Sequence, residues 1–145
     1  MRKLLPIAVF VLAACASSRP SDPSAVAGEL VAAFNHLDTA AVEALLTEEA
    51  TAFLPTPDHA TLVRGRAAII AALAPMFAAE RERHTGPEYL HLVAKDIAAH
   101  TFGDTAVVTF DAGSGELHSR RTLVLIWRGG RWKIDHLHAS NQRSP

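Results

Sequence analysis

The sequence predicts an α+β domain in which three helices pack on one face of a curved antiparallel sheet. Apolar residues recur at the spacing of amphipathic helices as far as about residue 80. From residue 88 onward apolar and polar residues alternate, as they do in strands that are buried on one face. Glycine-containing turns divide this second part into successive strands. A run of helices followed by a run of strands indicates two packed layers.

Two helices are expected at the start of the domain, which we place at residues 24–140. Asp38 or Thr39 can cap the second helix, because a side-chain oxygen at this position accepts a hydrogen bond from a free amide of the first turn. The apolar face of the first helix consists of Val26, Leu30, Phe34 and Leu37. The apolar face of the second helix consists of Val42, Leu45 and Leu46.

Two short strands and a third helix follow. Residues 50–54 are typical of a strand that ends at a proline-rich segment, and residues 61–64 can pair back onto it. Gly65 interrupts the chain before an Ala-rich helix at residues 66–80. Pro75 lies within this helix and is expected to kink or divide it, because proline lacks the amide hydrogen and clashes with the preceding turn. The apolar positions of the helix are Ile69, Ile70, Leu73 and Phe77.

The strand part is expected to be an antiparallel meander that ends in a polar tail at residues 141–145. Gly129-Gly130 predicts the tightest hairpin, since both positions suit a two-residue turn. The other turns are expected at residues 102–104 and 113–115. The predicted strands are residues 89–99, 105–111, 118–128 and 131–139.

The chain begins with a segment typical of a secretory signal, residues 1–14. Arg2 and Lys3 precede an apolar run of about 11 residues, which is too short to span a bilayer. The run ends in Leu-Ala-Ala-Cys, which resembles the bacterial lipobox, where the cysteine is acylated and becomes the mature N-terminus. Cys15 is thus the predicted lipidation site, and residues 15–23 are a flexible linker. An ordinary signal with an incidental cysteine is the alternative.

The lipobox resemblance implies a location in the bacterial cell envelope, lipid-anchored on the periplasmic side. Ala16 follows the cysteine where an aspartate often retains lipoproteins at the inner membrane, so the outer membrane is favoured if the cell has one. The chain after residue 14 keeps 12 basic and all 15 acidic side chains, a formal charge of −3. Nucleic-acid binding is not expected, because it needs a basic face. Acylated Cys15 leaves no thiol for a disulfide or a nucleophile.

The order of the elements, with Gly65-Arg66 opening the third helix, resembles the SnoaL-like domains of the nuclear transport factor 2-like superfamily. The closest match is the final hairpin, residues 127–140, with an aromatic strand end, a glycine turn, Trp-Lys-Ile and His-x-His-x-Ser. This hairpin also resembles the association domain of calcium/calmodulin-dependent protein kinase II. The resemblance implies a cystatin-like cone with an internal pocket, and homodimers that form through the sheet. It implies no single activity, because the superfamily includes isomerases, cyclases, dehydratases, hydrolases and assembly domains.

Strict alternation in the last strand puts Trp132, Ile134, His136 and His138 on one face, and the apolar members favour the inward face. The two histidines then lie about 7 Å apart and point into the pocket. Imidazoles can transfer protons near neutral pH, so His136 and His138 are the candidate catalytic residues. All four are candidate ligand-binding residues. The alternative is that the histidines are core residues bonded to a carbonyl or to Ser140.

Two further candidate ligand-binding residues, His118 and Arg120, share one phase of the preceding strand and could reach the same cavity. Either Arg120 or Arg121 is expected to point toward the cone. His-x-His could hold a metal ion if His118, His91 or a carboxylate completed the site, but no helical zinc motif accompanies it. We therefore predict no metal and no cofactor.

No carboxylate can be assigned as a catalytic base from the sequence. Asp38 is explained by helix capping, Glu49 by solvation, and Asp111 by its adjacent turn. The resulting prediction is an envelope-anchored lipoprotein that binds a small, largely apolar molecule in its pocket. The first alternative is a small isomerase, cyclase or dehydratase that pairs a pocket histidine with a carboxylate. The second is a non-catalytic dimer with a role in envelope assembly.

Overall fold

The computed structural model describes residues 21–55, 61–86, 88–114 and 117–142. The predicted signal, Cys15 and most of the linker lie outside the described residues, and so does the end of the predicted tail. The helices are α1 (Ala25–Asn35), α2 (Thr39–Leu45) and α3 (Arg66–Arg83). The strands are β1 (Leu46–Phe53), β2 (Val63–Arg64), β3 (Val93–Phe102), β4 (Thr105–Ser114), β5 (Leu117–Arg128) and β6 (Arg131–Gln142).

The helices begin and end close to where the sequence places them. The carboxylate of Asp38 accepts a hydrogen bond from the amide of Ala41 at 2.9 Å, so the predicted cap of α2 is confirmed. Helix α3 continues through Pro75 to Arg83, so the proline does not divide the helix, and the alternative of a kink stays a prediction. Leu46, expected on the apolar face of α2, instead begins β1 and is fully buried.

The six strands form one sheet in the order β2-β1-β6-β5-β4-β3. All neighbours are antiparallel except β1 and β6, which run parallel. The predicted meander of β3 to β6 is confirmed, and Gly129 and Gly130 turn its last hairpin with φ angles of 60° and 78°. The parallel pairing of β1 with β6 is the one join that the sequence pattern does not predict. Strand β6 also runs to Gln142, two residues into the segment predicted to be a tail.

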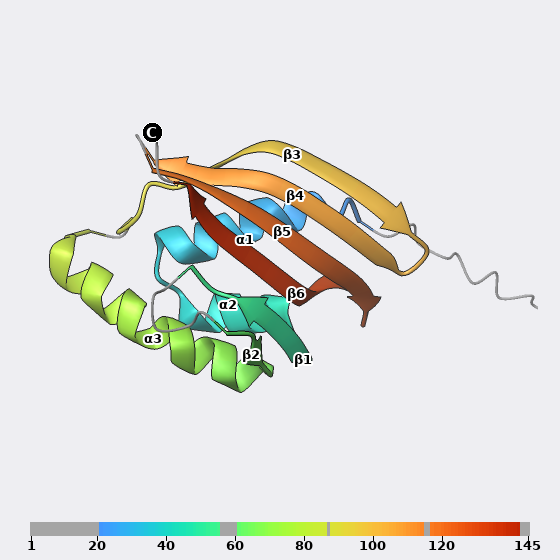
Figure 1. Ribbon diagram of the computed structural model, residues 1–145, viewed down its shortest axis with the longest axis horizontal. Helices are drawn as coiled ribbons and strands as arrows, with labels where there is room; N and C mark the ends of the chain where they lie inside the picture. The colour runs from blue at the N-terminus through green and yellow to red at the C-terminus, as the bar shows by residue number, and fades with distance from the viewer. Residues whose placement is uncertain (1–20, 56–60, 87, 115–116, 143–145) are drawn as a thin grey trace, which may run out of the picture.

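The helices cover one face of the curved sheet, which we call the core face (Figure 1). Phe77 of α3 packs edge-to-face against Phe34 of α1, with ring centroids 5.3 Å apart, and joins the two longer helices. The opposite face of the sheet, here called the outer face, is covered by none of the three described helices (Figure 1). The largest apolar side chains that are fully buried in the core are Leu37, Leu46, Ile69, Leu73, Phe77, Leu123, Leu125 and Ile134.

An irregularity in β6 reverses the phase of its side chains. Leu125 of β5 pairs with Ile134, but the next residue back, Val124, pairs with His136, so Asp135 is an extra residue. Such a β-bulge shifts every later side chain to the other face. The hydroxyl of Thr47 in β1 donates a hydrogen bond of 2.8 Å to the bulged Asp135. The bulge therefore decides which residues of β6 face the helices.

Candidate functional site

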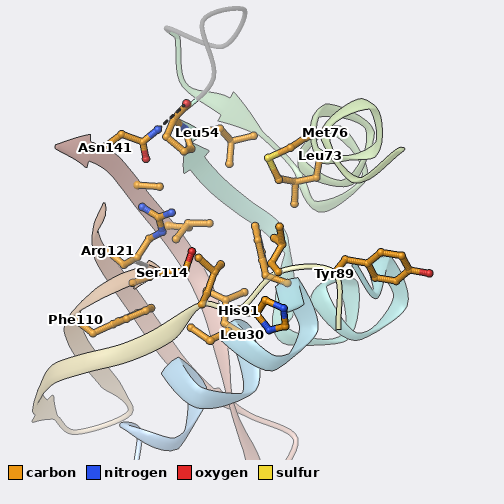
Figure 2. A pocket seen from close by; sticks show the side chains of 18 of the residues that line it. Leu30, Leu54, Leu73, Met76, Tyr89, His91, Phe110, Ser114, Arg121 and Asn141 are labelled. Atoms are coloured by element: carbon orange, nitrogen blue, oxygen red, sulfur yellow. Dashed lines mark hydrogen bonds between the residues drawn. The ribbon is translucent and has the colours of Figure 1, made fainter. Parts of the chain in front are cut away.

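A cavity of about 280 Å³ lies between α1, α3 and the core face of the sheet. Its inner walls are aliphatic and aromatic, and Leu30, Leu73, Phe110 and Leu137 are almost wholly buried. Figure 2 shows Leu73 and Met76 of α3 across the cavity from the side chains that the sheet contributes. The lining residues are Leu30, Val31, Phe34, Leu54, Pro55, Leu73, Met76, His84, Tyr89, Leu90, His91, Leu92, Phe110, Ala112, Ser114, Arg121, Leu137, Ala139 and Asn141.

The polar side chains of the sheet wall gather at one end of the cavity. Ser114 ends β4, Asn141 lies near the end of β6, and Arg121 lies near the start of β5, so the antiparallel strands bring them to the same edge (Figure 2). Asn141 also approaches the carbonyl of Pro55, 3.5 Å away. The cavity is therefore apolar inside and polar near its opening.

Arg121 is the one cationic Lys or Arg side chain among the described residues that line this cavity. Its Nη1 donates to the hydroxyl of Ser119 and, at 3.2 Å, to the carbonyl of Arg120. Ser119 is buried, and its hydroxyl also contacts the carbonyl of Ser140 at 2.8 Å and Oδ1 of Asn141 at 2.9 Å. Burial lowers the pKa of Arg121 to about 10, so the guanidinium group remains charged at neutral pH.

Two histidines lie at the opening of the cavity. The Nε2 atom of His84 lies 3.3 Å from a carboxylate oxygen of Glu80, and the Nδ1 atom of His91 lies 3.6 Å from one of Glu88. Both histidines are exposed. The ring of Tyr89 points away from the cavity in Figure 2. The charged groups of the opening thus belong to the surface rather than to the apolar interior.

None of the six residues predicted from the sequence to bind a ligand lines the cavity. Trp132 and Ile134 face the helices as predicted, but they are packed in the core, at 2% and 0% exposure. The indole nitrogen of Trp132 donates to the carbonyl of Ser21 at 2.6 Å. The prediction that His136 and His138 share this face is wrong, because the extra residue Asp135 turns both toward the outer face.

On the outer face His136 and His138 lie beside β1. The ring centroid of Phe53 is 6.0 Å from that of His136 and 5.6 Å from that of His138. The Nδ1 atom of His136 is hydrogen-bonded to the hydroxyl of Thr51 at 2.8 Å. Burial lowers the pKa of His136 below its usual value, the neighbouring His138 lowers it further, and the charge of Asp135 acts in the opposite direction.

His118 and Arg120 also lie on the outer face of the sheet, because they pair in register with Gln142 and Ser140 and alternate with the buried Ser119. The expectation that they reach the cavity is therefore wrong. Of the two adjacent arginines, Arg121 points inward and Arg120 outward. The sequence predicts that one of the two arginines points inward. Which one it is depends on the side-chain alternation of β5, and the sequence analysis placed His118 and Arg120 on the inward face together with His136 and His138.

The carboxylates considered as bases lie elsewhere in the fold. Asp38 caps α2, Glu49 pairs with Arg128 at 3.7 Å, and Asp111 lies opposite Arg120 on the outer face. No Asp or Glu is among the described residues that line the cavity. Within the same described segments, no three His, Cys, Asp or Glu side chains are grouped so as to hold a metal ion. Nor does any described helix combine the length and hydrophobicity needed to cross a membrane.

Comparison with solved structures identifies proteins that share this fold. The chain is similar to a nuclear transport factor 2-like protein of unknown function from Pseudomonas putida, with 20% identity, a TM-score of 0.67, and 83% of this chain and 84% of that one covered. A candidate dehydratase from Streptomyces avermitilis matches with 19% identity, a TM-score of 0.66 and coverage of 83% and 93%. A candidate calcium/calmodulin-dependent protein kinase II association domain from Thiobacillus denitrificans matches with 22% identity, a TM-score of 0.65 and coverage of 86% and 97%.

These identities are low, so the three structures establish the shared fold alone. No functionally curated protein matches the chain. The model of the SnoaL-like domain matches residues 24–143, which include every described helix and strand. The chain therefore belongs to the family of SnoaL-like domains, and its fold is that of the nuclear transport factor 2-like superfamily.

Proposed function

We propose that this domain binds a small, largely apolar molecule in the cavity between its helices and its sheet. The observation that carries the proposal is the cavity itself, which encloses about 280 Å³ within mainly aliphatic and aromatic walls. Ligand sites in proteins are concave and mostly apolar, with a few polar groups that set the orientation of the ligand. A ligand with apolar surface would gain about 25 cal/mol for each Å² that it removes from water here.

We propose further that Cys15 is acylated and holds the domain at the bacterial envelope. The support is in the sequence: the basic start, the short apolar run and the Leu-Ala-Ala-Cys ending. Residues 15–23 would then tether the domain within about 30 Å of the membrane surface, at the reach of an extended chain. A membrane is a reservoir of apolar molecules, so the two parts of the proposal fit one another.

The arrangement of the cavity favours binding over catalysis. His136 and His138, the predicted acid–base residues, lie on the outer face. Two histidine–carboxylate pairs adjoin the cavity, His84 with Glu80 and His91 with Glu88, and both are exposed at its opening. Glu80 also pairs with Arg83 at 3.1 Å. An acid–base site needs its groups within reach of the reacting atoms in an enclosed pocket. We therefore place the enzymatic alternative second.

Mass spectrometry of the full chain expressed in a bacterial host tests both parts of the proposal. A protease site within residues 15–23 would release the domain from the envelope without detergent, so a bound molecule is kept. We expect a co-purifying small molecule in native spectra of the domain, and a diacylated or triacylated Cys15 on the N-terminal fragment. Ala139→Leu, which narrows the cavity, is expected to remove the molecule.

His138→Phe is the matched control, since it changes a neighbouring β6 residue on the outer face and should leave the bound molecule in place. If the domain is empty and also fails to bind 1-octanol, a neutral apolar probe, the binding proposal is wrong. An unmodified Cys15 in the processed protein would contradict the proposed anchor.

A further inference from the structure

We propose that the ligand of the cavity is an amphipathic anion whose carboxylate pairs with Arg121 while its apolar chain extends between α1 and α3. This inference rests on the proposed binding function and specifies the chemistry of the ligand. The observation behind it is a cationic side chain that lines an apolar cavity without an acidic partner among the described residues. No Asp or Glu of the described segments lies within ion-pair distance of Arg121, although Arg66, Arg83, Arg128 and Arg131 each have one.

The hydrogen bonds of Arg121 leave room for a ligand. An arginine carries five N–H donors in a planar fork. The described contacts use Nη1 alone, toward Ser119 and the carbonyl of Arg120. The donors on Nε and Nη2 have no acceptor among the described residues. Two parallel donors of this kind match the two oxygens of a carboxylate.

The surroundings of Arg121 hold the guanidinium group in position. Ser119 is 2% exposed and accepts from Nη1, while its own hydroxyl contacts the carbonyl of Ser140 and Oδ1 of Asn141. These contacts are all to neutral groups. A cation removed from water without a counter-ion is costly, which is the reason that burial lowers the pKa of Arg121. A bound anion would supply the missing charge and would be favoured for the same reason.

The position of Arg121 sets the direction of the ligand. It lies at the same edge of the sheet as Ser114 and Asn141, whose polar side chains are exposed at the opening of the cavity (Figure 2). Leu30, Leu73 and Leu137, in contrast, are almost wholly buried. The head group would therefore lie near the opening beside Arg121, and the apolar chain would fill the interior.

The experiment compares octanoate with 1-octanol, which share a chain and differ in the charge of the head group. Isothermal titration calorimetry of the released domain at pH 7.5 should show octanoate binding at least tenfold more tightly, a difference of about 1.4 kcal/mol. Arg121→Met should abolish this preference, so that octanoate binds no more tightly than octanol. Arg121→Lys, which keeps the charge without the fork, should retain part of the preference.

Arg120→Met is the matched control, because it removes the adjacent arginine from the outer face and should preserve the preference for octanoate. Equal binding of octanoate and octanol to the unmodified domain would overturn the inference while leaving the proposed apolar site intact. Failure of both probes to bind would instead contradict the proposed function itself. If Arg121→Met does not fold, the comparison of octanoate with octanol in the unmodified domain and in Arg121→Lys still tests the inference.

Discussion

The imidazole of His136 is held on the outer face by neighbours that disfavour its charged form. Burial and the adjacent His138 lower its pKa, and the hydroxyl of Thr51 bonds its Nδ1 atom at 2.8 Å. In the unfolded chain the same histidine has the ordinary value of 6.5. As the pH falls through this value, the unfolded chain takes up a proton that the folded domain resists, so the folded state loses stability.

The first prediction follows from that difference. Between pH 7.5 and pH 5.5 the free energy of unfolding should fall more steeply in the unmodified domain than in His136→Gln, as measured by urea unfolding at each pH. Thr101→Gln, which changes an exposed residue of β3 that does not titrate, is the control and should leave the pH dependence of the unfolding free energy unchanged. If the free energy of unfolding falls by the same amount with pH in His136→Gln and in the unmodified domain, the lowered pKa of His136 is contradicted.

Single residues also show what the sequence could not settle. An inward arginine near the start of β5 was predicted, but not which of Arg120 and Arg121 it is. Two adjacent residues of a strand always point to opposite faces, so the choice depends on the phase of the strand alone. The sequence offers no local signal for that phase here, because the polar residues Ser119 and Arg121 occupy the core face of β5.

At the scale of elements, alternation and glycine turns predicted the four long strands and their hairpins correctly. The helices were also predicted, since apolar spacing is a strong signal over several turns. The bulge at Asp135 was not predicted, because strict alternation was assumed through His136 and His138. The sequence does carry a signal, since the apolar positions change phase here, from Trp132 and Ile134 to Leu137 and Ala139. The location of the candidate site at the end of β6 was missed for this reason.

The second prediction concerns that bulge. Deletion of Asp135 removes the extra residue, so Leu137 still faces the core and His136 and His138 still face outward. We expect this deletion variant to keep a cooperative thermal transition by circular dichroism. Deletion of Val107 from β4, which pairs with β5 without an irregularity, is the contrast: it moves the side chains on one side of the deletion to the other face and should abolish the cooperative transition. Loss of cooperativity on deletion of Asp135 would contradict the assignment of this residue as the extra one.

At the scale of the whole molecule, the described helices all lie on the core face and leave the outer face of the sheet without a helical cover from residues 21–142 that the structure describes (Figure 1). Val107, Thr122 and Val124 are adjacent in register at its centre and are partly buried. The homodimer implied by the family resemblance remains a prediction, and this face is where it would form. The same dimer would be the basis of the assembly role.

The third prediction tests this interface. Sedimentation velocity of the released domain should give a dimer, and Val124→Glu should convert it to a monomer, because a buried unpaired charge at an interface centre is strongly unfavourable. Ala71→Glu adds the same charge on the exposed side of α3 and should leave the dimer intact. A monomer at all concentrations in the unmodified domain would contradict the predicted homodimer.

The parallel pairing of β1 with β6 has a consequence for how the chain folds. Thr47 and Asp135, joined by a hydrogen bond, are 88 residues apart, so nearly the whole domain is a loop between them. Closing so long a loop is entropically costly and slows folding. A nascent chain therefore cannot complete its sheet until the last strand has been synthesised, and until then one edge of β1 is unpaired. A chain cut anywhere before residue 131 would leave that strand edge open to pairing with another molecule.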